Sequence, residues 1–137
     1  MQELRRWRSH LKLELNLEPK YFPTDPKLAS CVVIAAIEAG HNVTELVYEL
    51  MRAVWVREED VSDPSVIKSA IERSEGNVAE LLSAANQLHV QSVFSENSER
   101  AVTKGVFGVP SYVVGEEVFW GQDRLEFLDT FLNDNFA

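Results

Sequence analysis

One stretch, residues 105–125, limits what this chain can fold into more than any other: Gly-Val-Phe-Gly-Val-Pro-Ser-Tyr-Val-Val-Gly-Glu-Glu-Val-Phe-Trp-Gly-Gln-Asp-Arg-Leu. Pro110 fixes its own φ angle, donates no backbone hydrogen bond and restricts Val109 to extended conformations. If the Val109-Pro110 bond is cis, the chain turns sharply and the N–H and C=O of Val109 point outward. We therefore expect Val109 to offer a backbone edge to a peptide-like ligand.

The rest of this stretch predicts a β-hairpin followed directly by a helix. Residues 112–114 and 118–120 are β-favouring and flank a Gly-Glu-Glu turn at 115–117. Gln122 and Asp123 then fall in the expected first helical turn. Leucines and phenylalanines continue at helical spacing towards the C-terminus.

Two motifs in this region, 105–110 and 120–125, carry a resemblance to a known family. Gly-Val-Phe-Gly-Val-Pro followed by Trp-Gly-Gln-Asp-Arg-Leu resembles the C-terminal half of a thioredoxin-like domain. It is similar in particular to the 2-hydroxychromene-2-carboxylate isomerase group and its relatives, the kappa-class glutathione transferases and DsbA-type oxidoreductases. The resemblance implies glutathione as the cofactor.

The resemblance also implies a half-site for that cofactor. Val109, before Pro110, would pair its backbone with the cysteinyl unit of glutathione, and Gln122 and Asp123 would hold the γ-glutamyl end. This has a physical basis, because helix N-terminal N–H groups suit a carboxylate and an Asp side chain suits an ammonium group. The alternative is that Asp123 is only a helix-start acid worth about 0.3–1 kcal/mol and that Pro110 is only a turn residue.

The resemblance starts part-way through the family's fold, after its opening β-α-β unit. Family members open with a β-α-β unit that bears the serine or cysteine activating the glutathione thiol, and nothing in this sequence corresponds to that unit. Ser9 and Ser30 do not sit at a strand-to-helix turn, so the catalytic residues stay unassigned.

Two functions are compatible with this resemblance. The first is a truncated glutathione-dependent isomerase or transferase in which helices of region 28–102 supply an apolar pocket for a small aromatic acid. The second is an inactive relative that persists as an oligomeric binding or interaction module. In the family's fold, the strand at 112–114 lies beside the first strand of the β-α-β unit. Without that strand its edge is unpaired, and an unpaired edge can pair with a strand of another chain. We therefore expect a homodimer or larger oligomer.

Length, composition and charge limit the kinds of protein that this chain can be. A length of 137 residues predicts one domain, and 45% hydrophobic residues can supply its core. A formal net charge of -9 argues against binding to nucleic acids or anionic membranes. The single cysteine, Cys31, excludes an internal disulfide, and the N-terminus does not resemble a signal peptide, so we expect a cytoplasmic location.

The predicted fold class is α+β and mostly helical, with an incomplete thioredoxin-like sheet. The single domain 1–137 divides into a helix and extended segment at 1–25, a helical part at 26–104 and a β-β-α ending at 105–137. Four or five helices are expected before the hairpin, the last running from 77 to about 102, and alternating leucines predict an extended or strand segment at 11–17.

Other site types receive little support from the sequence. Cys31 lies in an apolar helical segment without a Cys-x-x-Cys partner, which favours a core residue over a nucleophile. His10, His41 and His89 show no metal-ligand spacing. Basic residues near the N-terminus, among them Arg5, are better interpreted as a solvated face than as an anion site.

Overall fold

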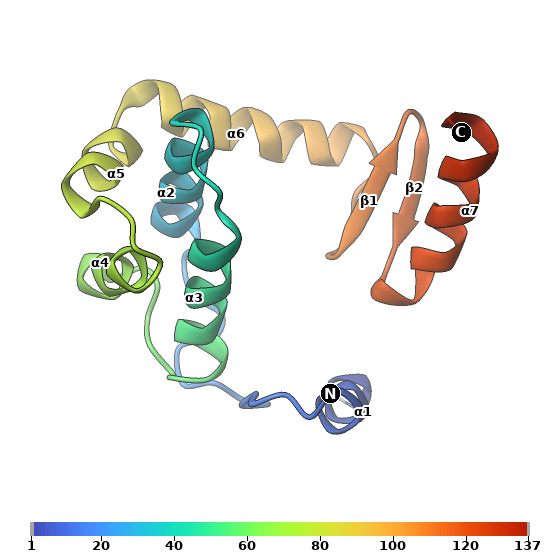
Figure 1. Cartoon of the computed structure of the whole chain (residues 1–137), viewed down its shortest axis with the longest axis horizontal. Coiled ribbons are helices and arrows are strands. Elements are labelled where there is room, and N and C mark those ends of the chain that lie inside the picture. The colour runs from blue at the N-terminus through green and yellow to red at the C-terminus, as the bar shows by residue number, and fades with distance from the viewer. Residues whose placement is uncertain (1, 137) are drawn as a thin grey trace. The chain divides into compact units, whose positions relative to one another are not determined.

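The computed structural model describes residues 2–136, which form two compact units. One unit spans Met1–Phe94 and the other Ser95–Ala137. Residues 1 and 137, the two ends of the predicted single domain, lie outside the described residues, and that domain assignment stays a prediction. The predicted fold class is confirmed, because helices dominate and the sheet is small (Figure 1).

All regular secondary structure among residues 2–94 is helical, and the last helix of the first unit continues into the second. None of the helices within residues 2–136 combines the length and apolar character needed to cross a membrane. The bounds of the helices are α1 Gln2–Leu11, α2 Lys27–Glu38, α3 Thr44–Trp55, α4 Pro64–Arg73, α5 Val78–Ala85 and α6 Leu88–Thr103.

The core of the first unit lies where α2 packs against α5 and α3 packs against α4. Val32, Ile67 and Ile71 are its largest fully buried side chains. Apolar residues recur at spacings of three and four along α3, and only some of them lie in this core. Leu46 and Leu50 are buried, whereas Met51 is 55% exposed, so α3 presents a second apolar face away from the core.

Local sequence signals explain the ends of α4. The carboxylate of Asp63 accepts a hydrogen bond from the N–H of Ser65 at 2.8 Å, and Pro64 occupies the first helical turn. At the other end, the Gly76 N–H donates to the carbonyl of Ile71 at 2.9 Å. A Cβ at position 76 would lie 2.8 Å from Ile71 Cγ2. A side chain at this position would therefore clash with Ile71, which explains the glycine just after the helix.

The single long helix predicted from residue 77 to 102 is wrong. The chain breaks at Asn86 and Gln87 into α5 and α6, so six helices precede the hairpin within residues 2–136. The Asn86 side-chain amide donates to the carbonyl of Leu82 at 2.7 Å, and the Gln87 carbonyl accepts from the N–H of Gln91. These bonds occupy backbone groups at the end of one helix and the start of the next.

The alternating leucines at 11–17 do not form a strand in the described structure. Instead Asn16 attaches this irregular segment to the C-terminal end of α3. Its backbone N–H donates to the carbonyl of Trp55 at 2.7 Å, and its side-chain amide donates to the carbonyl of Val56 at 3.1 Å. The segment therefore satisfies carbonyls that the helix leaves unpaired at its end.

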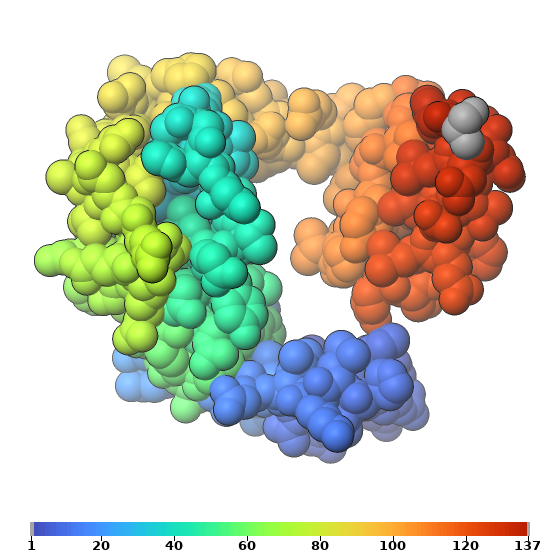
Figure 2. Space-filling view, in the orientation of Figure 1, coloured from blue at the N-terminus to red at the C-terminus, as the bar shows by residue number. Residues whose placement is uncertain are grey.

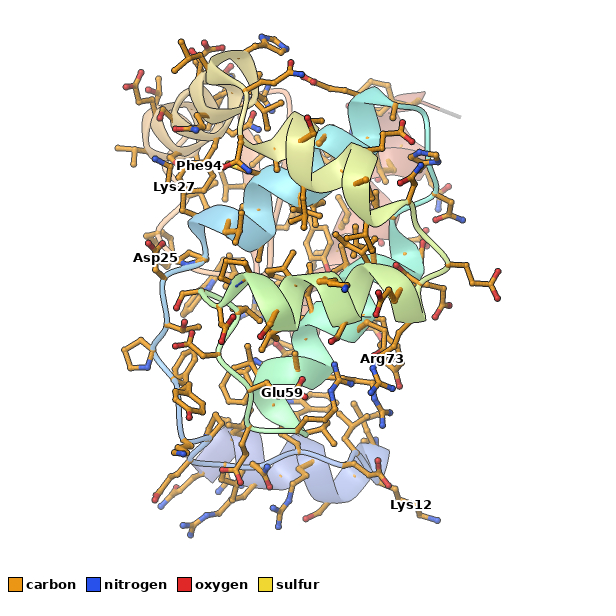
Figure 3. All side chains as sticks on the ribbon, turned by 90° about the vertical axis from the view of Figure 1, so that its left-hand side faces the viewer. Lys12, Asp25, Lys27, Glu59, Arg73 and Phe94 are labelled. Atoms are coloured by element: carbon orange, nitrogen blue, oxygen red, sulfur yellow. The ribbon has the colours of Figure 1, made fainter. Side chains whose placement is uncertain are left out.

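Ion pairs between half-buried side chains hold the loop after α3 against that helix. The Arg57 guanidinium contacts the carboxylates of Glu49 at 3.0 Å and Glu59 at 2.8 Å. Arg73, at the end of α4, approaches Glu49 at 4.0 Å. Figure 3 shows Glu59 and Arg73 on the side of α4 that faces α1. This network closes the end of the helical core near α1.

The second unit follows the predicted β-β-α order. Strands β1 (Ser111–Val114) and β2 (Glu117–Trp120) pair antiparallel, with Ser111 opposite Trp120. A short 3₁₀ turn, η1 (Gln122–Arg124), leads into α7 (Leu125–Phe136), which contacts β2. No side chain among residues 95–136 is fully buried.

Candidate functional site

A backbone hydrogen bond joins the two motifs that carry the predicted site. The N–H of Gly121 donates to the carbonyl of Pro110 at 2.9 Å, immediately beyond the Ser111 and Trp120 pair. The Val109-Pro110 bond is cis. The hairpin therefore holds the segment before Pro110 and the segment after Gly121 side by side at one end of the sheet.

The backbone of Val109 takes no part in the ladder between β1 and β2. The Pro110 carbonyl accepts from the N–H of Gly121, and the paired residues begin at Ser111. Within residues 2–136 neither the N–H nor the C=O of Val109 makes a hydrogen bond, and the residue is 89% exposed. These are the properties that an edge for an extended peptide-like ligand requires.

The loop before Pro110 is held in place by two residues that the sequence analysis did not single out. The Ser111 hydroxyl donates to the carbonyl of Gly108 at 2.6 Å. A Cβ at Gly108 would lie 2.6 Å from the indole nitrogen of Trp120, so the indole packs directly on this glycine. In the sequence, Gly108 stands two residues before Pro110, and Trp120 ends the second predicted strand. This pattern could have indicated the contact.

Gln122 and Asp123 begin η1, and both are exposed. They were predicted in an α-helical first turn, whereas α7 itself starts only at Leu125. Gly121 has a φ of 108°, and a Cβ there would lie 2.5 Å from Asp123 Oδ1. The Asp123 carboxylate thus folds back over Gly121, towards the end of the hairpin that Pro110 shares.

The Asp123 carboxylate has one charged partner among the described residues of this unit. Its Oδ2 lies 3.3 Å from the Arg124 guanidinium, and both side chains are more than half exposed. Exposed ion pairs contribute roughly 0–1 kcal/mol, so a ligand ammonium can share or replace this contact at small cost. Asp123 is therefore available to bind a cation.

An aromatic pocket lies in the same unit, beside the Pro110 and Gly121 junction. It has a volume of about 630 Å³. The Phe107 and Trp120 rings in its wall are 4.8 Å apart. Sequence analysis placed these aromatics in a loop and a strand without predicting a pocket. Its lining residues are Phe107, Val118, Phe119, Trp120, Arg124 and Phe127.

No catalytic group is assigned within residues 2–136. Cys31 is 2% exposed in the core of the first unit, and burial raises the pKa of its thiol, so the thiolate is disfavoured. The described residues contain no cluster of three or more potential metal ligands. The exposed groups at this end of the hairpin are the backbone of Val109, the Gln122 amide and the Asp123 carboxylate.

Comparison with known proteins places the chain in a family. The model of the DSBA-like thioredoxin domain matches residues 1–133. The 2-hydroxychromene-2-carboxylate isomerase of Sphingobium xenophagum is 25% identical over 134 residues, which cover 98% of this chain and 67% of the relative. Human glutathione S-transferase kappa 1 is 28% identical over 152 residues, covering 98% of this chain and 65% of that protein.

The fold agrees with a solved structure of a 2-hydroxychromene-2-carboxylate isomerase. The TM-score is 0.73 at 20% sequence identity, over 97% of this chain and 64% of the solved chain. The chain thus spans about two thirds of the length of these relatives. Because the family model covers nearly the whole chain, the protein described here belongs to the DSBA-like thioredoxin domain family.

Proposed function

We propose that this protein binds glutathione and is a relative of 2-hydroxychromene-2-carboxylate isomerase. The hydrogen bond between Gly121 and Pro110 carries the proposal, because it brings both parts of the predicted half-site to one end of the hairpin. Two relatives support it: one is a glutathione S-transferase, and the other is an isomerase.

Each part of glutathione has a counterpart among the exposed groups of the second unit. The N–H and C=O of Val109 pair with the backbone of the cysteinyl residue, as an added strand would. The carboxylate of Asp123 binds the γ-glutamyl ammonium group, and the Gln122 amide binds the γ-glutamyl carboxylate. Pro110 positions Val109 without a donor of its own.

The catalytic activity is an extension of this proposal. In the isomerase or transferase function, the thiol of bound glutathione adds to a small aromatic acid. The binding step is therefore the part of the proposal to test first.

A calorimetric titration with reduced glutathione tests the half-site. Asp123→Ala should weaken binding by about tenfold, which corresponds to about 1.4 kcal/mol for a charged hydrogen bond. Asp129→Ala removes another exposed carboxylate of the same unit and should leave the affinity unchanged. The absence of binding at millimolar glutathione would refute the proposal.

A second ligand locates the effect of Asp123. Cysteinylglycine lacks the γ-glutamyl group, so it should bind more weakly than glutathione to the wild-type protein. Its affinity should also not change on Asp123→Ala, because the proposed partner of that carboxylate is missing. An equal loss for both ligands would instead mean that Asp123 acts through the structure of the site.

The second candidate function is an oligomeric interaction module. It is favoured by the two-stranded sheet, which leaves the outer edge of β1 without a neighbouring strand in the described structure. The four side chains of β1 carry no charge, and charges are the usual protection of such an edge. We propose that a second copy pairs with this edge to form a homodimer.

Light scattering at high micromolar concentration tests the dimer. Val113→Lys places a charge on the exposed strand and should dissociate it, since inward or edge lysines block strand pairing. Glutathione should compete with the dimer if both use the backbone of Val109. A monomer at high concentration in the absence of ligand would exclude the second candidate.

A further inference from the structure

Helix α1 is basic in a chain that is acidic overall. Arg5, Arg6 and Arg8 lie on it, and Lys12 follows its last residue. Residues 2–22 contain five basic and three acidic side chains, and so carry a net charge of +2. Because the whole chain carries -9, the other residues carry -11. The net charge, which argues against anionic membranes for the chain as a whole, therefore does not describe this end of the first unit.

Three of these cations have no anionic partner among the described residues. Arg6 forms an exposed ion pair with Glu3. The Arg8 guanidinium instead donates to a neutral group, a backbone carbonyl of the segment after α1, at 3.1 Å. Arg5 and Lys12 are exposed and make no ion pair within residues 2–136, and Figure 3 shows Lys12 extending into solvent. An anionic surface can therefore meet these charges without displacing another anion.

Exposed apolar side chains lie at the same end of the first unit. Leu11, the last residue of α1, is 54% exposed, and Leu13 is 52% exposed. Phe22 is 55% exposed, and its ring lies 4.7 Å from the ring of Trp55 at the end of α3. The carbonyl of Trp55 accepts from the N–H of Asn16 at 2.7 Å, so Phe22 and the segment after α1 meet at one end of that helix. Cations and apolar groups are thus exposed together.

Helix α1 has the pattern of a helix that lies on a membrane surface. Leu4, Trp7 and Leu11 recur at spacings of three and four along one side, and none of the side chains of α1 is buried. Basic amphipathic helices with Trp and Leu on the apolar side lie in the headgroup region of bilayers. Figure 1 shows α1 apart from α2, α4 and α5, and Figure 2 shows it as a ridge at one end of the first unit.

An anionic bilayer fits this end of the first unit better than another polyanion does. Clusters of four to eight basic residues on an amphipathic helix are typical of binding to anionic lipids, and each cation strengthens binding by roughly fivefold. The boundary between headgroups and acyl chains also accepts apolar side chains, which a nucleic acid backbone does not. Charges more than about 10 Å away are largely screened at about 0.1 M salt, and a helix is itself about 10 Å thick. Acids behind α1 therefore repel the bilayer only weakly.

We propose that α1 docks this protein on an anionic lipid surface. The cations of α1 and Lys12 pair with lipid phosphates and carboxylates, and Leu11 and Leu13 enter the headgroup boundary. The docking is peripheral, since no helix within residues 2–136 has the length and apolar character to cross a membrane. The proposal goes beyond glutathione binding, because α1 belongs to the first unit and contains none of the half-site residues.

Sedimentation of the full-length protein with lipid vesicles tests this docking. The protein should bind phosphatidylcholine vesicles that contain about 30% phosphatidylserine at about 0.05 M salt and should be released at about 0.5 M salt. Vesicles of phosphatidylcholine alone should bind it at least about tenfold more weakly. No binding to the anionic vesicles, or equal binding to both kinds, would overturn the proposal. Tighter binding to a short DNA duplex than to the anionic vesicles would assign the cations to nucleic acid and would also overturn it.

A pair of charge reversals makes the assignment to α1 specific. Arg5→Glu replaces a cation by an anion and should weaken binding to the anionic vesicles by about tenfold or more. Lys68→Glu is the matched control, because it makes the same change of charge on α4, where Lys68 lies 3.8 Å from Glu72. It should leave vesicle binding unchanged. Equal losses in the two variants would show that binding follows the net charge and not α1, and the proposal would be wrong.

A second pair of variants tests the apolar contribution. Leu11→Gln should weaken binding to the anionic vesicles by about threefold or more, because less apolar surface enters the bilayer. Ile37→Gln changes a side chain that is 56% exposed on α2 and should have no effect. Equal affinities of wild type and Leu11→Gln would contradict the insertion of this side chain. Glutathione affinity should be the same in wild type and Arg5→Glu, so failure of one proposal leaves the other standing.

Discussion

The two units of this protein differ in how they are stabilised. Every buried side chain of residues 2–136 lies in the first unit, whereas none of residues 95–136 is fully buried. The second unit is instead defined by turns, a short ladder and a few contacts such as the indole of Trp120 on Gly108. The proposed glutathione groups belong to this weakly buried unit, where backbone and side chains remain accessible to a ligand.

This difference is useful for binding. Apolar burial contributes most of the stability of a folded domain, and the helical core can supply it without constraining the hairpin. Val109 and Asp123 are exposed, so they are free to contact a ligand. We therefore expect changes in the core to alter stability and changes near the hairpin to alter binding.

The largest effect should come from the core. Ile67→Ala removes a fully buried side chain of α4 and should reduce the free energy of unfolding by about 2–5 kcal/mol. Leu128→Ala on α7 truncates a half-buried side chain and should cost only about 1 kcal/mol. Urea unfolding followed by circular dichroism measures both. Equal losses for the two variants would contradict the contrast between the units.

A substitution in the loop before Pro110 should affect the second unit alone. Gly108→Ala places a methyl group 2.6 Å from the Trp120 indole nitrogen, so the indole must move, at a cost of about 1–3 kcal/mol. The tryptophan emission should shift and glutathione binding should weaken, while the unfolding of α2 and α4 stays unchanged. An unchanged emission spectrum would show that the loop adapts without moving the indole.

The start of α4 provides a smaller effect in the first unit. Asp63→Ala removes the acceptor for the Ser65 N–H and should reduce the free energy of unfolding by about 1 kcal/mol. Asp63→Ser keeps a capping oxygen and should restore most of this stability. Both measurements use the same urea titration. Equal losses for Ala and Ser would show that the cap is not the source of the effect.

The smallest effect concerns acid stability in the first unit. The Thr24 hydroxyl, and the N–H and hydroxyl of Ser62, donate to the Asp60 carboxylate and lower its pKa below the usual value of 3.8. Such a group stabilises the fold above its unfolded pKa and loses this contribution as pH falls through the folded pKa. The free energy of unfolding should therefore fall below about pH 4. Asp60→Asn should weaken this dependence, and an unchanged dependence would contradict it.

Local chemistry predicted the hairpin well. The Gly-Glu pair at 115–116 forms the turn, and β-favouring residues flank it, so the strands required no tertiary information. Asp63 followed by Pro64 is likewise a local pattern typical of a helix start, and α4 begins there. The proximity of Pro110 and Gly121 follows from the same hairpin register.

Other parts of the structure depend on tertiary contacts, which the spacing of apolar residues in the sequence does not reveal. Leu88 continues the apolar spacing of α5, yet it is 85% exposed at the start of α6. The alternating leucines at 11–17 resemble a strand, but their backbone bonds go to α1 and the end of α3. Met51 fits a core stripe by spacing, whereas the structure places it on the exposed face of α3. In each case, the spacing of the apolar residues does not determine which of them the rest of the fold buries.

The most direct test of the central claim is amide hydrogen exchange with and without reduced glutathione. In the free protein, amides of α2 and α4 should exchange slowest and those of residues 105–124 much faster. Glutathione should slow exchange at Val109 and around Gln122 and Asp123 and leave the helical core nearly unchanged. Exchange that does not respond at residues 105–124, or that responds only in the first unit, would contradict glutathione binding at the hairpin.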